Sequence, residues 1–139
     1  MTDSDRSTEG LSPRVTVGIA VVELENRYLV GIRNDDAPLP GLSEFPGGKC
    51  RPGESPRDCA VRECREETGL EVAPIELLLE KSFQYDHAQV ELHFWRCQPE
   101  SVTDIADEHR GFRWIPAAEL ATLQFPEANT ELIALLASR

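Results

Sequence analysis

A chain of 139 residues with 40% hydrophobic residues can bury one core but is too short for two independent ones. Its formal net charge of -11 repels polyanions, whereas proteins that bind nucleic-acid polymers neutralise phosphates with Lys and Arg. DNA and RNA strands are therefore excluded as expected ligands. A small nucleotide stays possible, because a bound divalent metal reverses the local field of an acidic pocket.

The amino-terminal part of the chain predicts a tail, a β-hairpin and a loop. Residues 1–13 are polar and rich in Ser, Thr, Asp and Gly, so we expect a flexible tail before a single domain over residues 14–139. Residues 15–24 are β-branched and apolar, and residues 28–32 resume this pattern after a short polar turn. Two prolines and paired aspartates then make residues 34–42 a loop.

A helix with defined ends follows a glycine-rich segment. A short strand is expected at residues 44–45, directly before the glycines. Ser55 is suited to cap the amino terminus of the helix, and Pro56 to occupy its first position. We expect the helix to end near Thr68, because Gly69 can adopt the left-handed conformation that terminates helices.

The second half of the chain predicts further strands and a terminal helix. Its apolar runs alternate with turn-forming segments, and the last run has helical periodicity. We expect a mixed β-sheet between helices, which is an α+β fold of the α/β/α sandwich type. The predicted elements are strands at 75–84, 89–97 and 112–115, a loop at 101–110, a helical turn at 116–120 and a helix at 127–137.

The cysteines and the hydropathy pattern indicate the compartment. No C-x-x-C pair and no His at metal-ligand spacing accompany Cys50, Cys59, Cys64 and Cys97, so neither a zinc site nor a redox motif is predicted. No stretch approaches the roughly 20 apolar residues that span a bilayer, and residues 1–12 lack the apolar core of a signal peptide. We expect a cytoplasmic protein without membrane association.

The predicted helix carries three glutamates at helical spacing. Positions i, i+3 and i+4 share one helix face, so Glu63, Glu66 and Glu67 bring three carboxylates together. Two such charges about 4 Å apart repel by roughly 4 kcal/mol at an effective dielectric near 20. A hard divalent cation such as Mg²⁺ offsets this repulsion and also binds substrate phosphates. The alternative is a solvated acidic face balanced by Arg62 and Arg65.

The glycines before the helix favour the metal hypothesis. A glycine pair at 47–48 allows a tight loop whose backbone approaches a phosphate. From this pair to the end of the helix, the sequence resembles the Nudix box at every defining position, with Cys64 in place of the usual aliphatic residue. The matching residues are Gly48, Glu54, Arg62, Glu63, Glu66, Glu67 and Gly69.

The resemblance to Nudix hydrolases implies a Nudix fold and a set of catalytic residues. Mg²⁺, or alternatively Mn²⁺, would be held by Glu63, Glu66 and Glu67 and by the carbonyl of Gly47. The metal would activate water and bridge phosphate oxygens. Glu54 and Arg62 would form an orienting pair. The resemblance leaves the general base open between Glu63 and a glutamate outside the box.

From about residue 15 to residue 136 the chain is also similar to the MutT branch, which removes oxidised guanine nucleotides. This similarity implies that Arg33 and Lys49 contact phosphates, that Glu108 is an additional metal ligand, and that Asn129 reads the base. Solvated surface charges are the alternative for the first three residues, and a helix cap for Asn129. The motifs are residues 17–19 followed by Arg33, residues 44–49, Glu108 six positions before Trp114, and residues 125–129.

These resemblances predict a Mg²⁺-dependent pyrophosphohydrolase that converts nucleoside triphosphates into monophosphate and diphosphate, with 8-oxo-dGTP favoured. The same chemistry on CTP, dCTP or a nucleotide sugar is the second hypothesis. A non-catalytic ligand-sensing domain is the third, and the complete carboxylate set disfavours it. The expected partner is a small nucleotide rather than a nucleic-acid polymer or a membrane, and the protein is expected to be a monomer or a homodimer.

Overall fold

The computed structural model describes residues 14–33, 41–84, 86, 88–103 and 105–139, so the expected tail lies outside the described residues. No helix in this described part is long and apolar enough to cross a membrane.

The elements are β1 (Arg14–Leu24), β2 (Arg27–Ile32), β3 (Ser43–Glu44), β4 (Gly47–Lys49), α2 (Pro56–Thr68), β5 (Val72–Gln84), β6 (Gln89–Pro99), β7 (Glu108–His109), β8 (Phe112–Pro116), the 3₁₀ turns η1 (Ala117–Thr122) and η2 (Glu127–Asn129), and α3 (Thr130–Ala137).

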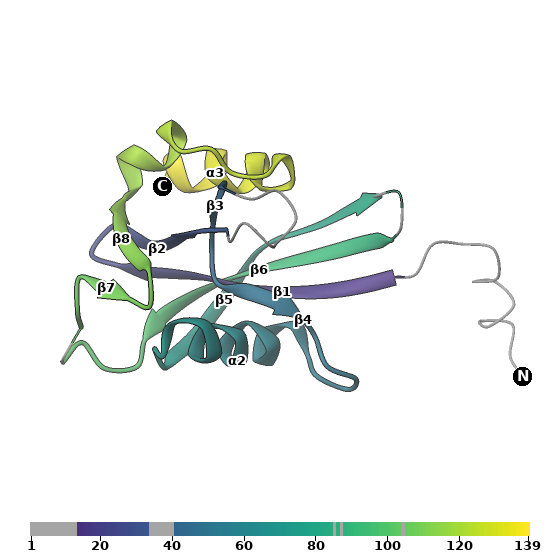
Figure 1. Ribbon diagram of the computed structural model, residues 1–139, viewed down its shortest axis with the longest axis horizontal. Helices are drawn as coiled ribbons and strands as arrows, with labels where there is room; N and C mark the ends of the chain where they lie inside the picture. Colours follow the sequence, from purple (N-terminus) through teal and green to yellow (C-terminus); the bar gives the residue numbers. More distant parts are fainter. Residues whose placement is uncertain (1–13, 34–40, 85, 87, 104) are drawn as a thin grey trace, which may run out of the picture.

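The strands form one mixed sheet with helices on both sides, so the predicted α+β fold is confirmed. The strand order is β5-β6-β1-β2-β8-β7, with β3 beside β2 and β4 beside β1. Helix α2 covers one face of this sheet and α3 covers the other (Figure 1). Strands β1 and β6 run parallel, while the other pairs are antiparallel.

Strand β1 organises the sheet because its two edges have different partners. One edge pairs with β6 in continuous register from Arg14 to Val22. The other edge pairs with β4 at Val17–Ile19 and with β2 only at its carboxyl-terminal end. The strand therefore changes partner half-way along this edge, and the segment carrying the paired glycines is held against it.

Helix α2 has the bounds that its local sequence predicted. The Oγ atom of Ser55 accepts a hydrogen bond from the backbone N–H of Asp58 at 3.1 Å, and Pro56 occupies the first turn. Gly69 has φ 79°, and its N–H donates to the carbonyl of Arg65 at 2.8 Å. These contacts satisfy groups that a helix leaves unpaired at its ends, so the helix begins and ends where the capping residues stand.

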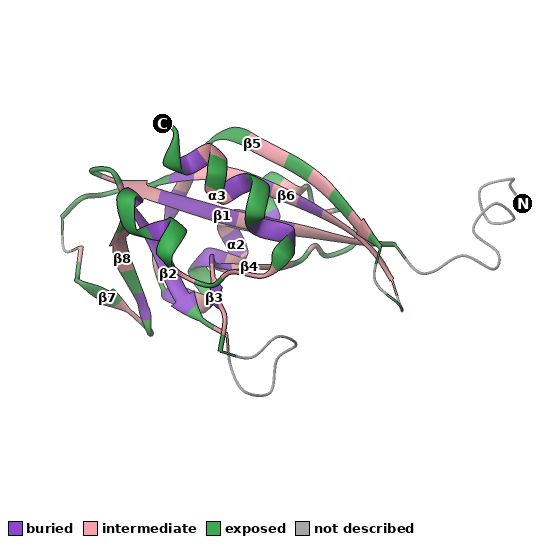
Figure 2. Cartoon of the chain, turned by 90° about the horizontal axis from the view of Figure 1, so that it is seen from above, coloured by how far each residue is buried: buried purple, intermediate pink, exposed green. Residues whose placement is uncertain are grey.

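The two faces of β1 differ in side-chain size. Ala20 and Val22 pack with α2, whereas Val21 belongs to the core beneath α3. Figure 2 shows a buried stretch of β1 between the two helices. On the α2 side, a Cβ atom at Gly18 would lie 2.5 Å from the carbonyl oxygen of Pro56. Only glycine at this position lets the helix backbone approach the strand this closely.

Three local differences separate the structure from the sequence prediction. The glycines expected to form only a loop make strand β4, because pairing with β1 satisfies their backbone groups. The expected loop at residues 101–110 contains β7, which pairs with β8 around a turn at Arg110 and Gly111. The expected helix at residues 127–137 divides into η2 and α3, because the N–H of Asn129 bonds to the carbonyl of Pro126 in a tighter turn.

We predict that Gly18→Ala destabilises the domain by about 1–3 kcal/mol, the usual effect of forcing extra atoms into a packed contact. The obstacle is helix backbone, which cannot move away as a flexible side chain can. Urea unfolding measures the change. Val102→Ala, which alters an exposed side chain, is the control. An unchanged unfolding midpoint for Gly18→Ala would show that α2 does not depend on this close approach.

Candidate active site

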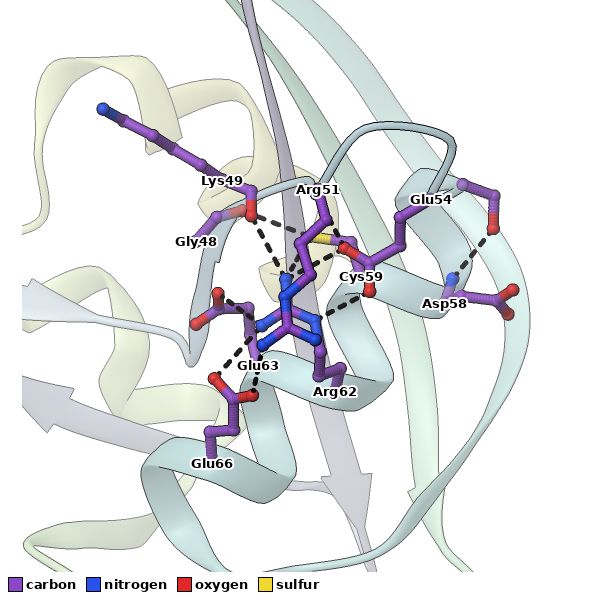
Figure 3. A network of polar contacts seen from close by, with 10 residues as sticks. Gly48, Lys49, Arg51, Glu54, Asp58, Cys59, Arg62, Glu63 and Glu66 are labelled. Atoms are coloured by element: carbon purple, nitrogen blue, oxygen red, sulfur yellow. Dashed lines mark hydrogen bonds and ion pairs between the residues drawn. The ribbon is translucent and has the colours of Figure 1, made fainter.

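Arg62 is the centre of a buried polar network on α2 (Figure 3). Its Nε and Nη2 atoms donate to both carboxylate oxygens of Glu54, at 2.7 and 2.9 Å. Its Nη1 atom donates to Glu63 at 3.0 Å and to Glu66 at 3.1 Å. Nη2 also donates to the backbone carbonyl of Lys49 at 3.2 Å. One guanidinium therefore joins the glycine-rich segment, the following loop and the helix.

The loop side of this network holds Glu54 in its ionised form. The hydrogen bonds from Arg62, followed by the one from the backbone N–H of Arg51, lower the pKa of Glu54 to about 2. The contact with Glu54 in turn raises the pKa of Arg62 above its usual range. Arg51 also pairs with Glu66 at 3.2 Å. The predicted orienting pair of Glu54 and Arg62 is thus in direct contact.

The other side of α2 brings two carboxylates against the paired glycines. A Cβ atom at Gly48 would lie 2.6 Å from the carboxyl carbon of Glu63, so this acid occupies space that any side chain would fill. Glu67 lies near the carboxyl group of Glu63 and the backbone of Gly47, and both influence its pKa. Burial, then Glu63 and Glu44, raises the pKa of Glu67 to about 8.

This pair of acids suits a divalent cation. Arg62 balances the charge of Glu63 only in part, because it also pairs with Glu54 and Glu66, and neighbouring carboxylates are the oxygen ligands that a hard cation prefers. Within the described residues, however, no three His, Cys, Asp or Glu side chains already surround one point. Glu66, which is half exposed, faces Arg51 and Arg62 instead. Glu63 and Glu67 with the backbone of Gly47 are therefore the part of the predicted ligand set that lies together, and their role in metal binding stays a prediction.

A cavity of about 660 Å³ borders the paired glycines. We call it the apolar cavity, since side chains such as Ile19, Phe45 and Leu92 form most of its wall. Three of the predicted contact residues also line it, namely Arg33, Lys49 and Asn129, as does Ala88. The side chain of Lys49 points away from the Arg62 network (Figure 3). Arg33 pairs with Glu44 at 3.4 Å.

The amide of Asn129 borders the apolar cavity and does not cap α3. The residue is 8% exposed and occupies the cap position of α3, yet its side chain makes no capping hydrogen bond. Its side-chain amide forms no hydrogen bond with another residue in the described part of the chain. A buried amide that borders a cavity in this way has donors and acceptors available for a bound molecule.

A second cavity of about 610 Å³ lies on the other side of Glu44. We call it the acidic cavity, because Glu44 and Glu67 line it together with Arg110 and Phe112. Glu44 borders both cavities. Glu108 is not among the residues that line either one. It is exposed on β7 opposite Arg113, so its predicted approach to the other carboxylates is not seen in this structure.

Three residues of this region were not singled out by the sequence interpretation. Glu44 was expected as part of a strand and of the motif at residues 44–49, with no role of its own, and its position just before the paired glycines was the available signal. Arg51 pairs with a box glutamate from within the loop. Arg110 donates to the carbonyl of Glu66 at 3.0 Å from a distant hairpin, and no local pattern could have shown this contact.

Comparison with known proteins agrees with this geometry. The NUDIX domain family matches residues 12–136. The chain belongs to the Nudix family. It is 32% identical over 118 residues to the CTP pyrophosphohydrolase of Escherichia coli (strain K12), covering 85% of this chain and 86% of that protein. The solution structure of the E. coli ORF135 protein superposes with a TM-score of 0.73 at 30% identity, covering 94% of this chain and 96% of that one.

The Nudix hydrolase is also similar to MutT enzymes. It is 27% identical over 124 residues to the 8-oxo-dGTP diphosphatase of E. coli (strain K12), covering 88% of this chain and 96% of that protein. The protein is accordingly a hydrolase of diphosphate bonds, from a family that acts on small nucleotides and generally uses divalent metal ions.

We predict that Glu54→Gln lowers the thermal midpoint at pH 7 by several degrees, because the amide cannot pair with the Arg62 guanidinium as a carboxylate does. The folded-state pKa of Glu54 lies below its ordinary value of 4.5. Its ionised form therefore stabilises the fold above this value, and the effect is lost as the pH falls toward 2.

The difference between wild type and Glu54→Gln should accordingly shrink on acidification. Thermal unfolding at a series of pH values measures this convergence, with Glu119→Gln, a change at an exposed position, as the control. A difference that stays constant down to pH 2 would contradict the assignment of the stabilising contact to the ionised carboxylate.

Proposed function

We propose that this Nudix hydrolase cleaves nucleoside triphosphates into a monophosphate and diphosphate with Mg²⁺, and that 8-oxo-dGTP is its preferred substrate. The observation that carries the proposal is the composition of the apolar cavity. Its wall combines apolar side chains, the available amide of Asn129 and the cation Lys49 beside the paired glycines. This combination suits a base at one part of the cavity and phosphates at another.

Each group has a distinct part in the proposed reaction. Lys49 and Arg33 attract the phosphates, and the glycine backbone leaves them room to approach. Glu63 and Glu67, with Gly47 and with Glu66 and Glu108 as further candidates, would hold Mg²⁺, which supplies Lewis-acid stabilisation and an activated water when bound. Arg62 keeps Glu63 in place and balances the charge of Glu54 and Glu66.

Asn129 provides a basis for the choice of base. Its amide presents both a donor and an acceptor, so one side chain can match two edge groups of a purine. Oxidation of guanine adds a carbonyl at C8 and turns N7 from an acceptor into a donor. Sites that hydrogen-bond such groups discriminate strongly, because a mismatched base leaves buried polar atoms unpaired.

A cytidine nucleotide is the second candidate substrate. The specific support is the 32% identity to a CTP pyrophosphohydrolase, against 27% to the E. coli 8-oxo-dGTP diphosphatase. The chemistry and the carboxylates would be the same, and the difference would lie in the contacts of the base. We place the enzyme in the cytoplasm, since all four cysteines are free thiols and a reducing compartment keeps them so.

We predict that the enzyme releases monophosphate and diphosphate from nucleoside triphosphates, and only with added divalent metal. A panel of nucleotides and nucleotide sugars, with products separated by chromatography, tests this. Glu67→Gln should lower kcat by orders of magnitude, because a carboxylate that binds the metal is lost. Glu71→Gln is the matched control, as Glu71 follows the same helix but is exposed. Orthophosphate as the sole phosphate product, or activity that resists chelators, would refute the proposal.

We predict that Asn129→Ala reduces the preference for 8-oxo-dGTP over dGTP on the order of tenfold, since an unpaired polar group costs about 1 to 3 kcal/mol. The ratio of the two kcat/KM values at fixed Mg²⁺ is the measurement. Gln124→Ala removes an exposed amide from the same segment and should leave the ratio unchanged. A wild type without preference would refute the substrate assignment, whereas a preference that survives Asn129→Ala would refute only the role of this residue.

A further inference from the structure

Arg110 stands out among the arginines of this acidic protein because it lacks a carboxylate partner. Most arginines in the described part of the chain form ion pairs. Arg110 and Arg113 form none in that part, although Arg110 borders a cavity that is lined by Glu44 and Glu67. A protein with a net charge of -11 has ample carboxylates to neutralise its arginines. Arg110 is thus a cation beside the active site whose charge no described carboxylate takes up.

The hairpin between β7 and β8 holds this side chain in a defined position. Arg110 has φ 54° and Gly111 has φ 91°, so both central residues of the turn are left-handed. Asn or Gly is favoured at the first of these positions, so the backbone of Arg110 is in a conformation that arginine rarely adopts. The Nη1 atom donates to the carbonyl of Glu66 at 3.0 Å, and the guanidinium carbon would lie 3.3 Å from a Cβ atom at Gly69.

This anchoring uses little of the binding capacity of the guanidinium. The group has five N–H donors, and the bond to the Glu66 carbonyl is its one contact of this kind in the described part of the chain. The fork of remaining donors matches the oxygens of a phosphate, which accepts two parallel hydrogen bonds from an arginine. The helix carbonyl orients the side chain, and the other donors stay available at the cavity.

We propose that the acidic cavity is the subsite for the diphosphate part of the substrate and that Arg110 binds it. The inference rests on the proposed function. The two cavities meet at Glu44 and both border the predicted metal ligands, the apolar one at Gly47 and the acidic one at Glu67. In this proposal a phosphate chain extends from the apolar cavity past these ligands into the acidic one. Lys49 then binds the phosphate on the nucleoside side of the scissile bond, and Arg110 binds the diphosphate on the other side.

The charges in the acidic cavity are consistent with an anionic ligand. Glu44 is already paired with Arg33, and Glu67 belongs to the predicted metal ligands. Among the described residues that line the acidic cavity, Arg110 is the cation that can bind the departing diphosphate. The competing explanation is that Arg110 serves only to fix the end of α2 through the Glu66 carbonyl. A role of that kind would not distinguish diphosphate from monophosphate.

Calorimetric titration of inorganic diphosphate, with Mg²⁺ present, tests the subsite without requiring turnover. We expect Arg110→Ala to weaken diphosphate binding on the order of tenfold and to leave the binding of dGMP unchanged. Arg110→Lys should recover part of the affinity because it keeps the charge. Arg113→Ala is the matched control, since Arg113 is, like Arg110, an exposed arginine of this hairpin but lines neither cavity. The variant should bind both ligands as wild type does.

Three results would overturn the subsite. The first is no diphosphate binding by the wild type, and the second is unchanged diphosphate binding in Arg110→Ala. The third is an equal loss of dGMP and diphosphate binding that Arg110→Lys does not restore, which would indicate a structural role alone. Failure of the proposed function is recognised separately: the wild type would release no diphosphate from any nucleoside triphosphate, while diphosphate binding that depends on Arg110 would still establish the anion subsite.

Discussion

The geometry of the active site depends on one buried cation placed among acids. Arg62 binds Glu54 through two parallel hydrogen bonds and reaches Glu63 and Glu66 through its remaining end. Without it, several carboxylates would face one another in a region with little water, where repulsion is strong. Its bond to the carbonyl of Lys49 also ties α2 to the glycine-rich segment. A single guanidinium thus offsets part of the negative charge of the cluster and aligns the two segments that form it.

Arg62 divides the glutamates of α2 into two groups with different surroundings. Glu66 is neutralised by Arg51 and Arg62, so its charge is compensated within the protein. Glu63 and Glu67 meet beside the paired glycines, and burial together with their mutual repulsion disfavours ionisation of Glu67. Glu63 also pairs with Arg62, whereas Glu67 forms no ion pair in the described part of the chain, so a cation bound between these two acids would relieve their repulsion.

Packing on β1 is what brings these acids to the glycines. The small residues Gly18 and Ala20 allow α2 to lie close to the strand, and β4 pairs with the same stretch of β1. Helix and glycine segment are thereby fixed to a common support, which leaves the carboxylate of Glu63 directly over Gly48. The opposite face of β1 carries Ile19, which forms part of the apolar cavity. One strand therefore supports the predicted metal ligands on one side and the cavity wall on the other.

The sequence by itself determined the features that arise from neighbouring residues. Ser55 and Gly69 set the ends of α2, and helical spacing placed Glu63 and Glu67 on one face, because capping and helical periodicity act over a few positions. It also predicted the layered α+β fold from the order of apolar runs, but not strands β4 and β7, whose weak local preferences are overridden by pairing with distant strands.

Only the tertiary structure decided which charges meet. The sequence placed three glutamates on one helix face, yet the fold turned Glu66 toward two arginines and left the other two acids together. The fold also placed the Asn129 amide at a cavity, where it makes no capping bond to α3. It brought Arg110 to the end of α2, where it binds the carbonyl of Glu66. Ion pairs and cavities form between segments far apart in the chain, and their partners are chosen by packing, which no local pattern encodes.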